Sequence, residues 1–573
     1  MLDDLKVRKR IIFLFLTFIF LLLVLEVRLY AIMVIKSDFA KEAMDEQTYR
    51  SIVYYDGFEL KGDIYDANMR KLTNNGIEYK AIILPSAVIK HITSNNSTFE
   101  NLIRLICDYD KLDYYDMLTK ISKEAAGYDQ AVVVGINDRI KDEIESSNIT
   151  GIYVKSGIKK FADDIGASIL SNFLSNRMNG EYIKYDDSID MKIFNSLARH
   201  VKKIYKVPLD GRGMLMPGME PIDETVEESV GGPVGNVMLT LDYNIQKAAE
   251  DALHKKSDKN CAATVMDIRN GEVLAMATKD ENGWERNMVT YVNDNSAYNP
   301  GSLFKIIVLA AALEKNKVGL ETSFFCSGVD SETGIHCFNT SGHGMIGLED
   351  AFANSCNVYF INLARKVGPK AIMDMAQKFG FGKKALNFSK ESAGMVYRKS
   401  EDIEYDIGNI AIGQKDIMVT PLQVCSMISS IANNGMRNKP HILKRIFGDD
   451  GTVYEKHADE SKSIISPETS EIIQKLMTEV VKRGTGQKAS LYCGSAGKTG
   501  TAQRGIEYAD GNYEHEDSWF AGYLPLNHPK YAISVYVEDA ESKSSTAQEI
   551  FKSIGEKMLL FDNLSETPNA IYN

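Results

Sequence analysis

The chain begins with a long apolar segment. Residues 11–25 are nearly all apolar, and after Glu26 and Arg28 the apolar run resumes as far as residue 35. A helix rises about 1.5 Å per residue, so residues 11–35 are long enough to cross a hydrocarbon core of about 30 Å. We therefore predict a transmembrane helix over residues 11–35.

The charges around this segment predict its orientation. Four basic residues precede it: Lys6, Arg8, Lys9 and Arg10. Basic residues next to a transmembrane helix stay on the cytoplasmic side, which makes residues 1–10 a cytoplasmic tail and places the rest of the chain outside. No pair of small residues typical of a signal-peptidase site follows the apolar run, and this favours an uncleaved anchor over a cleaved signal peptide. We expect a single-pass protein of the cell membrane.

Residues 36–234 alternate short apolar runs with polar, helix-like stretches. Runs around residues 82–84 and 131–134 are typical of strands, and residues 63–68 of a strand that ends in a turn. Residues 37–51 are expected to be helical. Gly231-Gly232-Pro233 marks a linker over residues 227–235. We predict an elongated α+β domain over residues 36–234.

A second domain is predicted over residues 235–573. An apolar strand at residues 237–241 is followed by Asp242, a residue that typically caps a helix. Two apolar runs, 262–268 and 272–278, are joined by Arg269-Asn270-Gly271, and Asn-Gly between such runs is a strong hairpin signal. Residues 306–313 are apolar on nearly every helical face, so they predict a buried helix. The expected architecture is α+β, with an antiparallel sheet flanked by helices.

Composition narrows the possible functions. The 573 residues are 44% hydrophobic and 25% charged, which is ordinary for a globular protein, and a net charge of −12 argues against nucleic-acid binding. The seven cysteines contain no C-x-x-C motif, so neither a zinc ribbon nor a thioredoxin site is indicated. Cys326 and Cys337 could form a disulfide outside the membrane, or remain two unpaired, partly buried thiols. We expect Cys356 to be a buried packing residue.

The candidate chemistry begins at the buried helix. Pro300 and Gly301 mark a turn, which places Ser302 in or beside the first helical turn and Lys305 one turn later on the same face. Burial disfavours the charged form of a lysine, and a neutral lysine can take the proton of a serine and make it a nucleophile. The spacing alone is weak evidence, because Ser156/Lys159 and Ser495/Lys498 share it.

Two further groups follow Ser302 along the chain. Ser355 and Asn357 precede an apolar helix, where a hydroxyl could relay a proton and an amide could hold a peptide carbonyl. Lys498 and Thr499 stand before Gly500 and Thr501, ahead of the apolar strand at residues 519–523. The lysine and the hydroxyl would bind a carboxylate, and the glycine would let another backbone approach the strand.

In this order, the three groups resemble the motifs of penicillin-binding proteins and serine β-lactamases. The surrounding sequence is similar to class B penicillin-binding proteins, the monofunctional D,D-transpeptidases of cell-wall synthesis. The matching stretches are Tyr298–Ser302, Ser355–Asn357, Gly413–Gln414, Thr420–Gln423 and Lys498–Gln503. The resemblance covers residues 236–556. Upstream, Gly62–Asp66 resembles a family segment, from which Lys61, Ala67 and Met69 depart.

The resemblance implies an activity and a role for each residue. Ser302 would attack the penultimate D-Ala carbonyl of a stem peptide, with Lys305 as general base. Ser355 would pass the proton to the leaving amine and Asn357 would orient the peptide. Lys498, Thr499 and Thr501 would hold the terminal carboxylate, with Gly500 between them. The resemblance implies β-lactams as covalent inhibitors and no metal or organic cofactor.

The resemblance also implies a partner and leaves rival classes to be weighed. Residues 36–234 would be a non-catalytic pedestal that docks a polytopic glycan polymerase of the shape, elongation, division and sporulation family. A serine β-lactamase would need a means of activating water, but no Glu-x-x-Leu-Asn stretch lies between Asn357 and Lys498. A β-lactam sensor would carry several membrane segments, and a bifunctional synthase would carry a glycosyltransferase motif. The motifs do not distinguish an elongation enzyme from a division or a sporulation enzyme.

Overall fold

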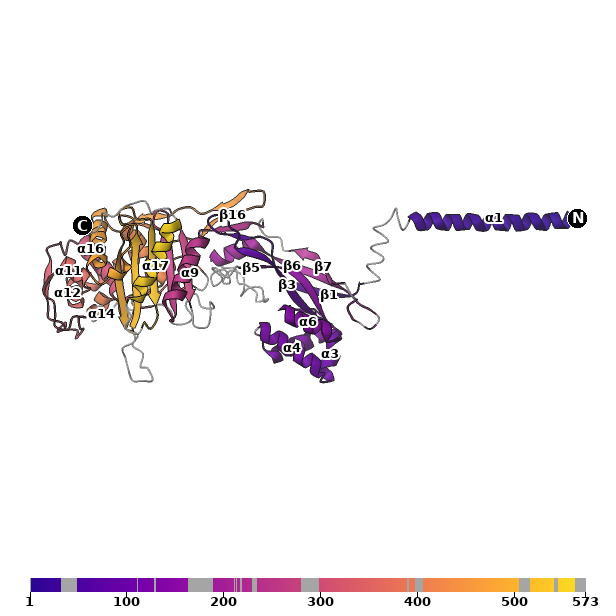
Figure 1. Cartoon of the computed structure of the whole chain (residues 1–573), viewed down its shortest axis with the longest axis horizontal. Coiled ribbons are helices and arrows are strands. Elements are labelled where there is room, and N and C mark those ends of the chain that lie inside the picture. The colour runs from indigo at the N-terminus through magenta and orange to yellow at the C-terminus, as the bar shows by residue number, and fades with distance from the viewer. Residues whose placement is uncertain are drawn as a thin grey trace. The chain divides into compact units, whose positions relative to one another are not determined.

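The computed structural model describes most of the chain. The described residues are 2–31, 49–110, 112–127, 130–162, 189–210, 212, 214–216, 219–228, 234–279, 298–388, 391–396, 406–503, 516–540 and 545–561. They belong to two compact units, each built from segments that are separated along the chain (Figure 1). The first unit comprises Met1–Phe58, Asn75–Lys159 and His200–Val230, and the second comprises Glu59–Asn74, Lys160–Arg199 and Gly231–Asn573.

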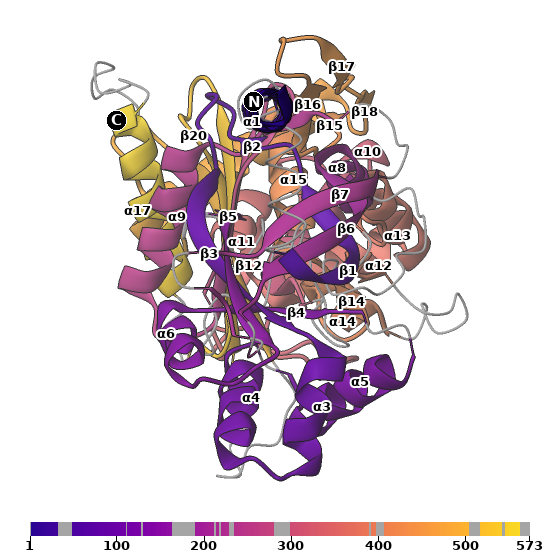
Figure 2. The same cartoon turned by 90° about the vertical axis from the view of Figure 1, so that its right-hand side faces the viewer.

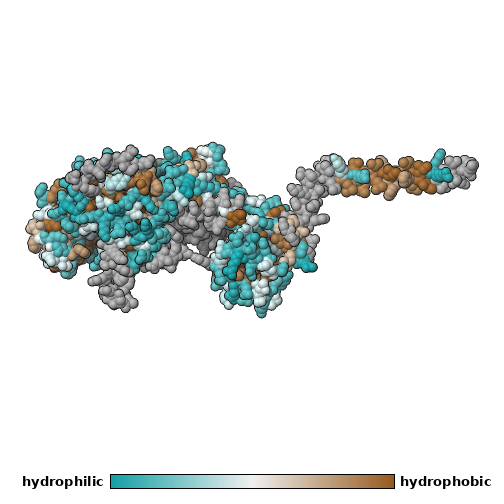
Figure 3. Space-filling view, viewed as in Figure 1, coloured by the Kyte–Doolittle hydropathy of each residue, from teal (hydrophilic) through white to brown (hydrophobic). Residues whose placement is uncertain are grey.

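The N-terminal apolar segment is a single helix, α1 (Leu2–Tyr30). Within it, Arg8–Tyr30 is a 23-residue stretch long and apolar enough to cross a membrane. Its large apolar side chains are exposed along its length, as the hydropathy colouring shows (Figure 3). At about 1.5 Å per residue the stretch is about 35 Å long, which exceeds a hydrocarbon core of about 30 Å. Residues 32–35, the end of the predicted span, lie outside the described residues.

The rest of the first unit contains two three-stranded sheets, in the orders β1-β6-β7 and β4-β3-β5. Figure 2 shows β1, β6 and β7 side by side. The strands are β1 (Tyr49–Leu60), β3 (Thr73–Ile83), β4 (Val132–Ile136), β5 (Ile152–Ala162), β6 (Ala198–Pro208) and β7 (Ile222–Glu228). The helices are α3 (Pro85–Thr93), α4 (Ser97–Asp110), α5 (Tyr114–Ala126) and α6 (Asp138–Ser146). Apolar residues of these helices pack on the β4-β3-β5 sheet in one core.

The predictions for this region agree only in part with the structure. The strands expected at residues 82–84 and 131–134 are confirmed as parts of β3 and β4. The helix expected at residues 37–51 is wrong at its last three positions, which belong to β1, and residues 37–48 lie outside the described part. Residues 227 and 228, assigned to a linker, end β7. Long-range strand pairing overrides local propensity at both places.

The second unit is built on a five-stranded antiparallel sheet in the order β10-β9-β21-β20-β19. The strands are β9 (Cys261–Asp267), β10 (Val273–Lys279), β19 (Ala496–Gln503), β20 (Glu516–Leu524) and β21 (Tyr531–Val537). The hairpin predicted from Asn270-Gly271 is confirmed as β9 and β10, and Gly271 has a φ of 84°. Among the described strands, β19 pairs with β20 alone and forms one edge of the sheet.

Helices cover both faces of this sheet. On one face, α9 (Tyr243–Lys256) and α17 (Thr546–Phe561) lie side by side and share a core with the sheet (Figure 1). On the other face lie α15 (Pro421–Ala432), α10 (Lys305–Glu314) and α16 (Pro467–Lys482). The remaining helices are α8 (Ile189–Leu197), α11 (Leu348–Ala353), α12 (Asn357–Val367), α13 (Pro369–Lys378), α14 (Ile407–Ile412) and the short 3-10 turns η2 (Gly301–Phe304) and η4 (Gln487–Ala489). The predicted antiparallel sheet flanked by helices is confirmed.

Local side-chain caps explain where two of these helices begin. Asp242 accepts hydrogen bonds from the backbone of Asn244 and Ile245 at the start of α9, as predicted. At the start of α15, Thr420 Oγ1 accepts from Gln423 N at 3.2 Å and Gln423 Oε1 accepts from Thr420 N at 2.9 Å. This reciprocal capping box gives the Thr420–Gln423 stretch a structural reason.

Several short strands complete the second unit. They are β2 (Ile64–Tyr65), β8 (Asn236–Leu239), β11 (Ser323–Cys326), β12 (Gly344–Gly347), β13 (Met395–Val396), β14 (Ile417–Met418), β15 (Met436–Asn438), β16 (Leu443–Phe447), β17 (Val453–Lys456) and β18 (Ser461–Ser463). β2 and β8 are parallel neighbours in a sheet ordered β17-β16-β8-β2.

Two segments upstream of residue 235 therefore belong to the second unit. The strand predicted within residues 63–68 is confirmed as β2. Ile64 of β2 and Ile193 of α8 are both fully buried in the large core of the second unit. A chain truncated to begin at Asn236 would lose this apolar packing, so truncation there removes part of the folded unit rather than a separate domain.

Candidate active site

The turn that carries Ser302 lies between the helical core and the sheet edge. Gly301–Phe304 forms a 3-10 turn that continues into α10, so Ser302 precedes the helix by one turn, as predicted. Ser302 is half buried, whereas Lys305 and the apolar residues that follow it are fully buried. The sequence pattern explains this burial, because α10 has no polar face to turn toward water. Ser302 is thus accessible from solvent, whereas Lys305, at the start of the next helix, is not.

Lys305 is held by the turn that contains Ser355 and Asn357. Its Nζ donates to Ser355 O at 2.7 Å, to Ser355 Oγ at 3.2 Å and to Asn357 Oδ1 at 2.6 Å. The Phe360 ring lies beneath the ammonium group, 5.6 Å from Nζ to the ring centroid. These contacts connect two of the predicted groups directly.

The Ser355–Asn357 turn has an unusual backbone. Ser355 has a φ of 55°, in the left-handed region that non-glycine residues rarely adopt. Cys356 is the N-cap of α12, and its sulfur accepts a hydrogen bond from Tyr359 N at 3.4 Å. Asn357 begins the helix, and its Nδ2 donates to His336 O at 2.8 Å. The Asn357 side chain is therefore fixed at both ends, by Lys305 and by His336.

The third group lies on the edge strand β19. Lys498 is fully buried, and its Nζ donates to Thr499 O at 3.1 Å. A Cβ added at Gly500 would lie 2.8 Å from Pro300 O, so only glycine allows the strand to pass this close to the turn. The backbone of Thr501 lies directly against Gly301, the residue before Ser302. The edge strand and the turn that carries Ser302 thus touch backbone to backbone.

Two buried lysines dominate the electrostatics of the site. Burial lowers the pKa of Lys305 to about 8, and the nearby Cys356 and Cys337 partly oppose this shift. Burial also lowers the pKa of Lys498, and the charge of Lys305 lowers it further. Neither lysine forms an ion pair with a carboxylate of the described residues. The site therefore favours an incoming anion, and at least one lysine is readily deprotonated.

The two other Ser-x-x-Lys pairs, Ser156/Lys159 and Ser495/Lys498, lack this geometry. Ser156 lies on β5, where its exposed Oγ donates to Glu220 Oε2 at 2.6 Å. Ser495 is buried with its Oγ donating to Ala489 O at 2.9 Å, and Lys498 follows on a strand. Residues three apart on a strand point to opposite faces, so only a helical turn brings such a pair together.

The structure adds Thr485, which the sequence analysis did not single out, and shows what Gly413 contacts. Thr485 Oγ1 lies 2.7 Å from Thr499 Oγ1, and Thr485 N donates to Ala353 O at 3.1 Å. Gly413 has a φ of 69°, and its carbonyl accepts from Gly301 N at 3.0 Å. Thr485 lies between Gly484 and Gly486 in the sequence. Glycines on both sides of a threonine indicate a close approach of two backbones, and this pattern could have pointed to Thr485.

Gly301→Ala tests the backbone contact that places Ser302. A Cβ at Gly301 would lie 2.2 Å from Thr501 O, and its φ of 54° is strained for any other residue. We expect the rate of acylation by a penicillin to fall at least tenfold, because strain of about 1–3 kcal/mol must be relieved by moving the turn from β19. Time-resolved labelling with a fluorescent penicillin measures this rate.

Gly319→Ala is the matched control for this variant. Gly319 is exposed after α10, and nothing lies within 4 Å of an added Cβ. Its labelling rate should equal that of the wild type. An unchanged rate in Gly301→Ala would show that the close approach to Thr501 is not needed for acylation.

Comparison with known proteins identifies the family. The penicillin-binding protein transpeptidase domain matches residues 261–556. The chain belongs to this transpeptidase family, and its relatives place it among the class B penicillin-binding proteins. The class predicted from the three motifs is thereby confirmed.

The similar proteins differ in how much of their length is shared. PbpB of Mycolicibacterium smegmatis is 30% identical over 386 residues, which are 62% of this chain and 58% of PbpB. Stage V sporulation protein D of Bacillus subtilis is 26% identical over 562 residues, 94% of this chain and 82% of that protein. Peptidoglycan D,D-transpeptidase PbpA of Mycolicibacterium smegmatis is 28% identical over 347 residues, 54% of this chain and 69% of PbpA. This chain therefore spans under two thirds of PbpB but most of the sporulation protein.

Two solved structures resemble the fold. Apo penicillin-binding protein 3 of Mycobacterium tuberculosis has a TM-score of 0.54 at 27% identity, covering 63% of this chain and 88% of that one. A peptidoglycan synthetase of Bifidobacterium adolescentis has a TM-score of 0.62, covering 91% of this chain and 99% of that one. At 20% identity, the second match supports the fold alone.

Proposed function

We propose that this chain is a peptidoglycan D,D-transpeptidase that acts through an acyl-Ser302 intermediate. One observation carries the assignment: Lys305, which begins the helix directly after the turn of Ser302, is fully buried and hydrogen-bonded to both Ser355 and Asn357. A buried lysine with a lowered pKa is suited to accept a serine proton, and its partners lie where they can pass that proton on.

The first half-reaction forms the acyl-enzyme. Ser302 Oγ attacks the penultimate D-Ala carbonyl as its proton moves to Lys305. The peptide C–N bond then breaks, and the proton reaches the departing D-Ala amine through Ser355. Donors aimed at the developing oxyanion are typically a large part of catalysis. The backbone N–H groups of Ser302 and Thr501 fill this role in the proposal, supported by the contact of Thr501 with Gly301.

The second half-reaction makes the cross-link. An amine of a neighbouring stem peptide attacks the ester carbonyl, the bond to Ser302 Oγ breaks and a new amide bond forms. The amine's proton returns to Ser302 through Lys305. Atoms balance without a cofactor, because one peptide bond replaces another.

The donor's terminal carboxylate accounts for the third motif. Lys498, Thr499 and Thr501 would bind it, and Asn357 would orient the donor peptide. Two buried lysines that form no ion pair with described residues favour an anionic group in the site. The hydrogen bond between the Thr485 and Thr499 hydroxyls fixes the Thr499 side chain in the proposed carboxylate site.

The membrane topology and the partner are further parts of the proposal. The basic residues at the start of α1 favour a cytoplasmic N-terminus and a catalytic domain outside the membrane, where stem peptides are found. Residues 36–234 would serve as a pedestal that docks a polytopic glycan polymerase, with Ile64 and Ile193 of this range packed in the core of the catalytic unit. The relatives named D,D-transpeptidases favour this role over a β-lactamase or a β-lactam sensor.

Release of D-Ala from a stem-pentapeptide mimic tests the activity. The full chain in detergent should release D-Ala and, with an acceptor amine present, form the cross-linked product. A hydrolysis assay with a β-lactam should show a long-lived acyl-enzyme, because no residue of the proposal activates water. Rapid drug turnover without cross-linking would instead indicate a β-lactamase, and acylation without any D-Ala release would indicate a sensor.

A further inference from the structure

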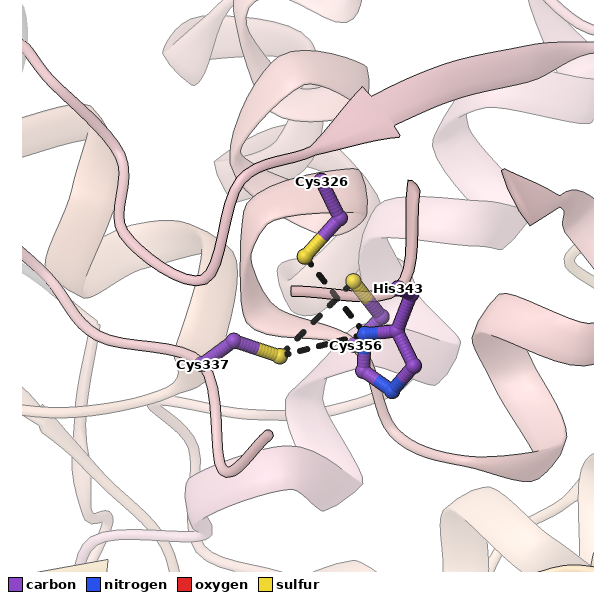
Figure 4. A group of neighbouring side chains, drawn as sticks. All are labelled: Cys326, Cys337, His343 and Cys356. Carbon is purple, nitrogen blue, oxygen red and sulfur yellow. Dashed lines mark hydrogen bonds between the residues drawn. The ribbon is translucent and has the colours of Figure 1, made fainter. Parts of the chain in front are cut away.

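Three cysteines and a histidine converge next to the Ser355–Asn357 turn. We refer to Cys326, Cys337, His343 and Cys356 as the cysteine–histidine cluster. Cys326 ends β11, Cys337 lies in the following loop, His343 precedes β12 and Cys356 caps α12. Figure 4 shows the three sulfurs and the imidazole Nδ1 pointing toward one another. None of these residues has a role in the serine chemistry proposed above.

The spacing of the four donor atoms matches a tetrahedral zinc site. The donor atoms all lie within 4.8 Å of one another. Cys337 Sγ lies 3.8 Å from Cys356 Sγ, and His343 Nδ1 lies 3.6 Å from Cys337 Sγ and 3.4 Å from Cys326 Sγ. Zinc bonds of about 2.3 Å to sulfur and about 2.0–2.1 Å to nitrogen give tetrahedral edges of about 3.8 Å between sulfurs and about 3.6 Å between sulfur and nitrogen.

The chemistry of the cluster also favours a metal. All three cysteines are free thiols and at most 2% exposed. A disulfide requires an S–S distance of about 2.05 Å and would join only two of the three. Sulfur and imidazole donors in a four-ligand set are the usual structural ligands of zinc.

The segment around the cluster buries few large apolar side chains of its own. Phe325 and Met345 are paired across β11 and β12, yet they are 63% and 66% exposed, and Phe338 is 99% exposed. A Cβ at Gly342, whose φ is 80°, would lie 2.4 Å from Cys326 O, so the loop crosses β11 closely at the cluster. Small segments of this kind often depend on a metal or a disulfide for stability.

We propose that the cysteine–histidine cluster binds one structural zinc ion through three cysteine sulfurs and His343 Nδ1. Four protein ligands leave no open coordination position, so the ion does not activate water. Binding converts each coordinating thiol to a thiolate and releases its proton to solvent. The backbone N–H groups of Asn339 and Asn357 donate hydrogen bonds to Cys337 Sγ, and such donors stabilise the negative charge of a thiolate ligand.

The metal would fix the turn that binds Lys305. Cys356 lies between Ser355 and Asn357, and Asn357 Nδ2 donates to the carbonyl of His336, the neighbour of Cys337. An ion that joins Cys337 to Cys356 therefore clamps the two segments that meet at Asn357. Cys337 and Cys356 are positioning residues in this proposal, because neither touches the reacting atoms.

Metal analysis of the full chain in detergent tests the site directly. Elemental analysis should find one zinc per chain. After removal by a chelator, Zn²⁺ alone should restore it, and Co²⁺ should give the intense visible bands of a tetrahedral thiolate complex. Alkylation followed by mass spectrometry should find the three cluster thiols protected until the chelator is added. Less than half an ion per chain, or a Cys326–Cys337 disulfide in the purified protein, would overturn the proposal even if every variant failed to fold.

Variants separate ligation from packing. Cys337→Ser should lose the zinc, lower the thermal midpoint and slow penicillin labelling at least tenfold. Cys337→His supplies another zinc ligand and should restore both zinc and labelling. Cys493→Ser removes a buried thiol outside the cluster and should keep one zinc per chain. Full zinc content in Cys337→Ser, or a failure of Cys337→His to regain any zinc, would argue that Cys337 is a packing residue.

Discussion

The Ser302→Ala variant should show no covalent labelling by a fluorescent penicillin. The proposed acyl bond forms at Ser302 Oγ, and alanine has no atom that can carry it. Ser302 is half buried, so loss of its hydroxyl should leave the fold intact and the thermal midpoint nearly unchanged. Gel fluorescence followed by peptide mass mapping measures the adduct and its position.

Ser156→Ala provides the matched control, because it removes the serine of a Ser-x-x-Lys pair in the first unit. Ser156 is half buried and hydrogen-bonded to Glu220, and the proposal gives it no role in the chemistry. Its labelling should equal that of the wild type. An adduct in the Ser302→Ala protein, or an adduct mapped to another residue in the wild type, would contradict the assignment.

The second large effect is expected from Lys305→Met. Methionine keeps most of the buried volume but removes the amine, so Ser302 loses its base and the Ser355–Asn357 turn loses its hydrogen-bond donor. Loss of a general base typically costs about 10²–10⁴-fold, and we expect the acylation rate constant to fall by this factor. Stopped-flow or quenched labelling with a β-lactam measures it. Lys315→Met, at the exposed end of the same helix, should not change the rate.

The pH dependence distinguishes a base from a structural lysine. Burial lowers the Lys305 pKa to about 8, so about a tenth of the molecules carry neutral Lys305 at pH 7 and the share grows with pH. The wild-type acylation rate should therefore rise with pH up to about 8 and then level off. The residual rate of Lys305→Met should lack the rise near pH 8, and a flat wild-type profile would contradict the assignment of Lys305 as base.

Much of the fold could be predicted because its signals are local. The Asn270-Gly271 turn fixes a hairpin through backbone conformation alone, and Asp242 caps a helix through its own side chain. The long apolar run of α1 needs no partner to be recognised. The predicted groups around Ser302, Ser355 and Lys498 could be found because each chemistry depends on residues two or three positions apart.

Contacts between distant segments could not be read in the same way. β2 lies upstream of the predicted domain boundary, yet it pairs with β8 because Ile64 is buried in the core of the second unit. The helix expected near residue 50 gave way to β1, since strand pairing outweighs local preference.

The sequence by itself indicated the residues to which we assign the chemistry, and the tertiary structure decided their environment. A Ser-x-x-Lys pair is visible in the sequence, but only packing of α10 against α12 and the Ser355–Asn357 turn buries Lys305 and lowers its pKa. Cys326, Cys337, His343 and Cys356 are spread over 31 positions without a zinc-binding motif, so no local pattern marks them. They meet because β11, β12 and α12 fold together. The burial of Lys305 and the meeting of these four side chains both require contacts between distant segments, which the local sequence does not show.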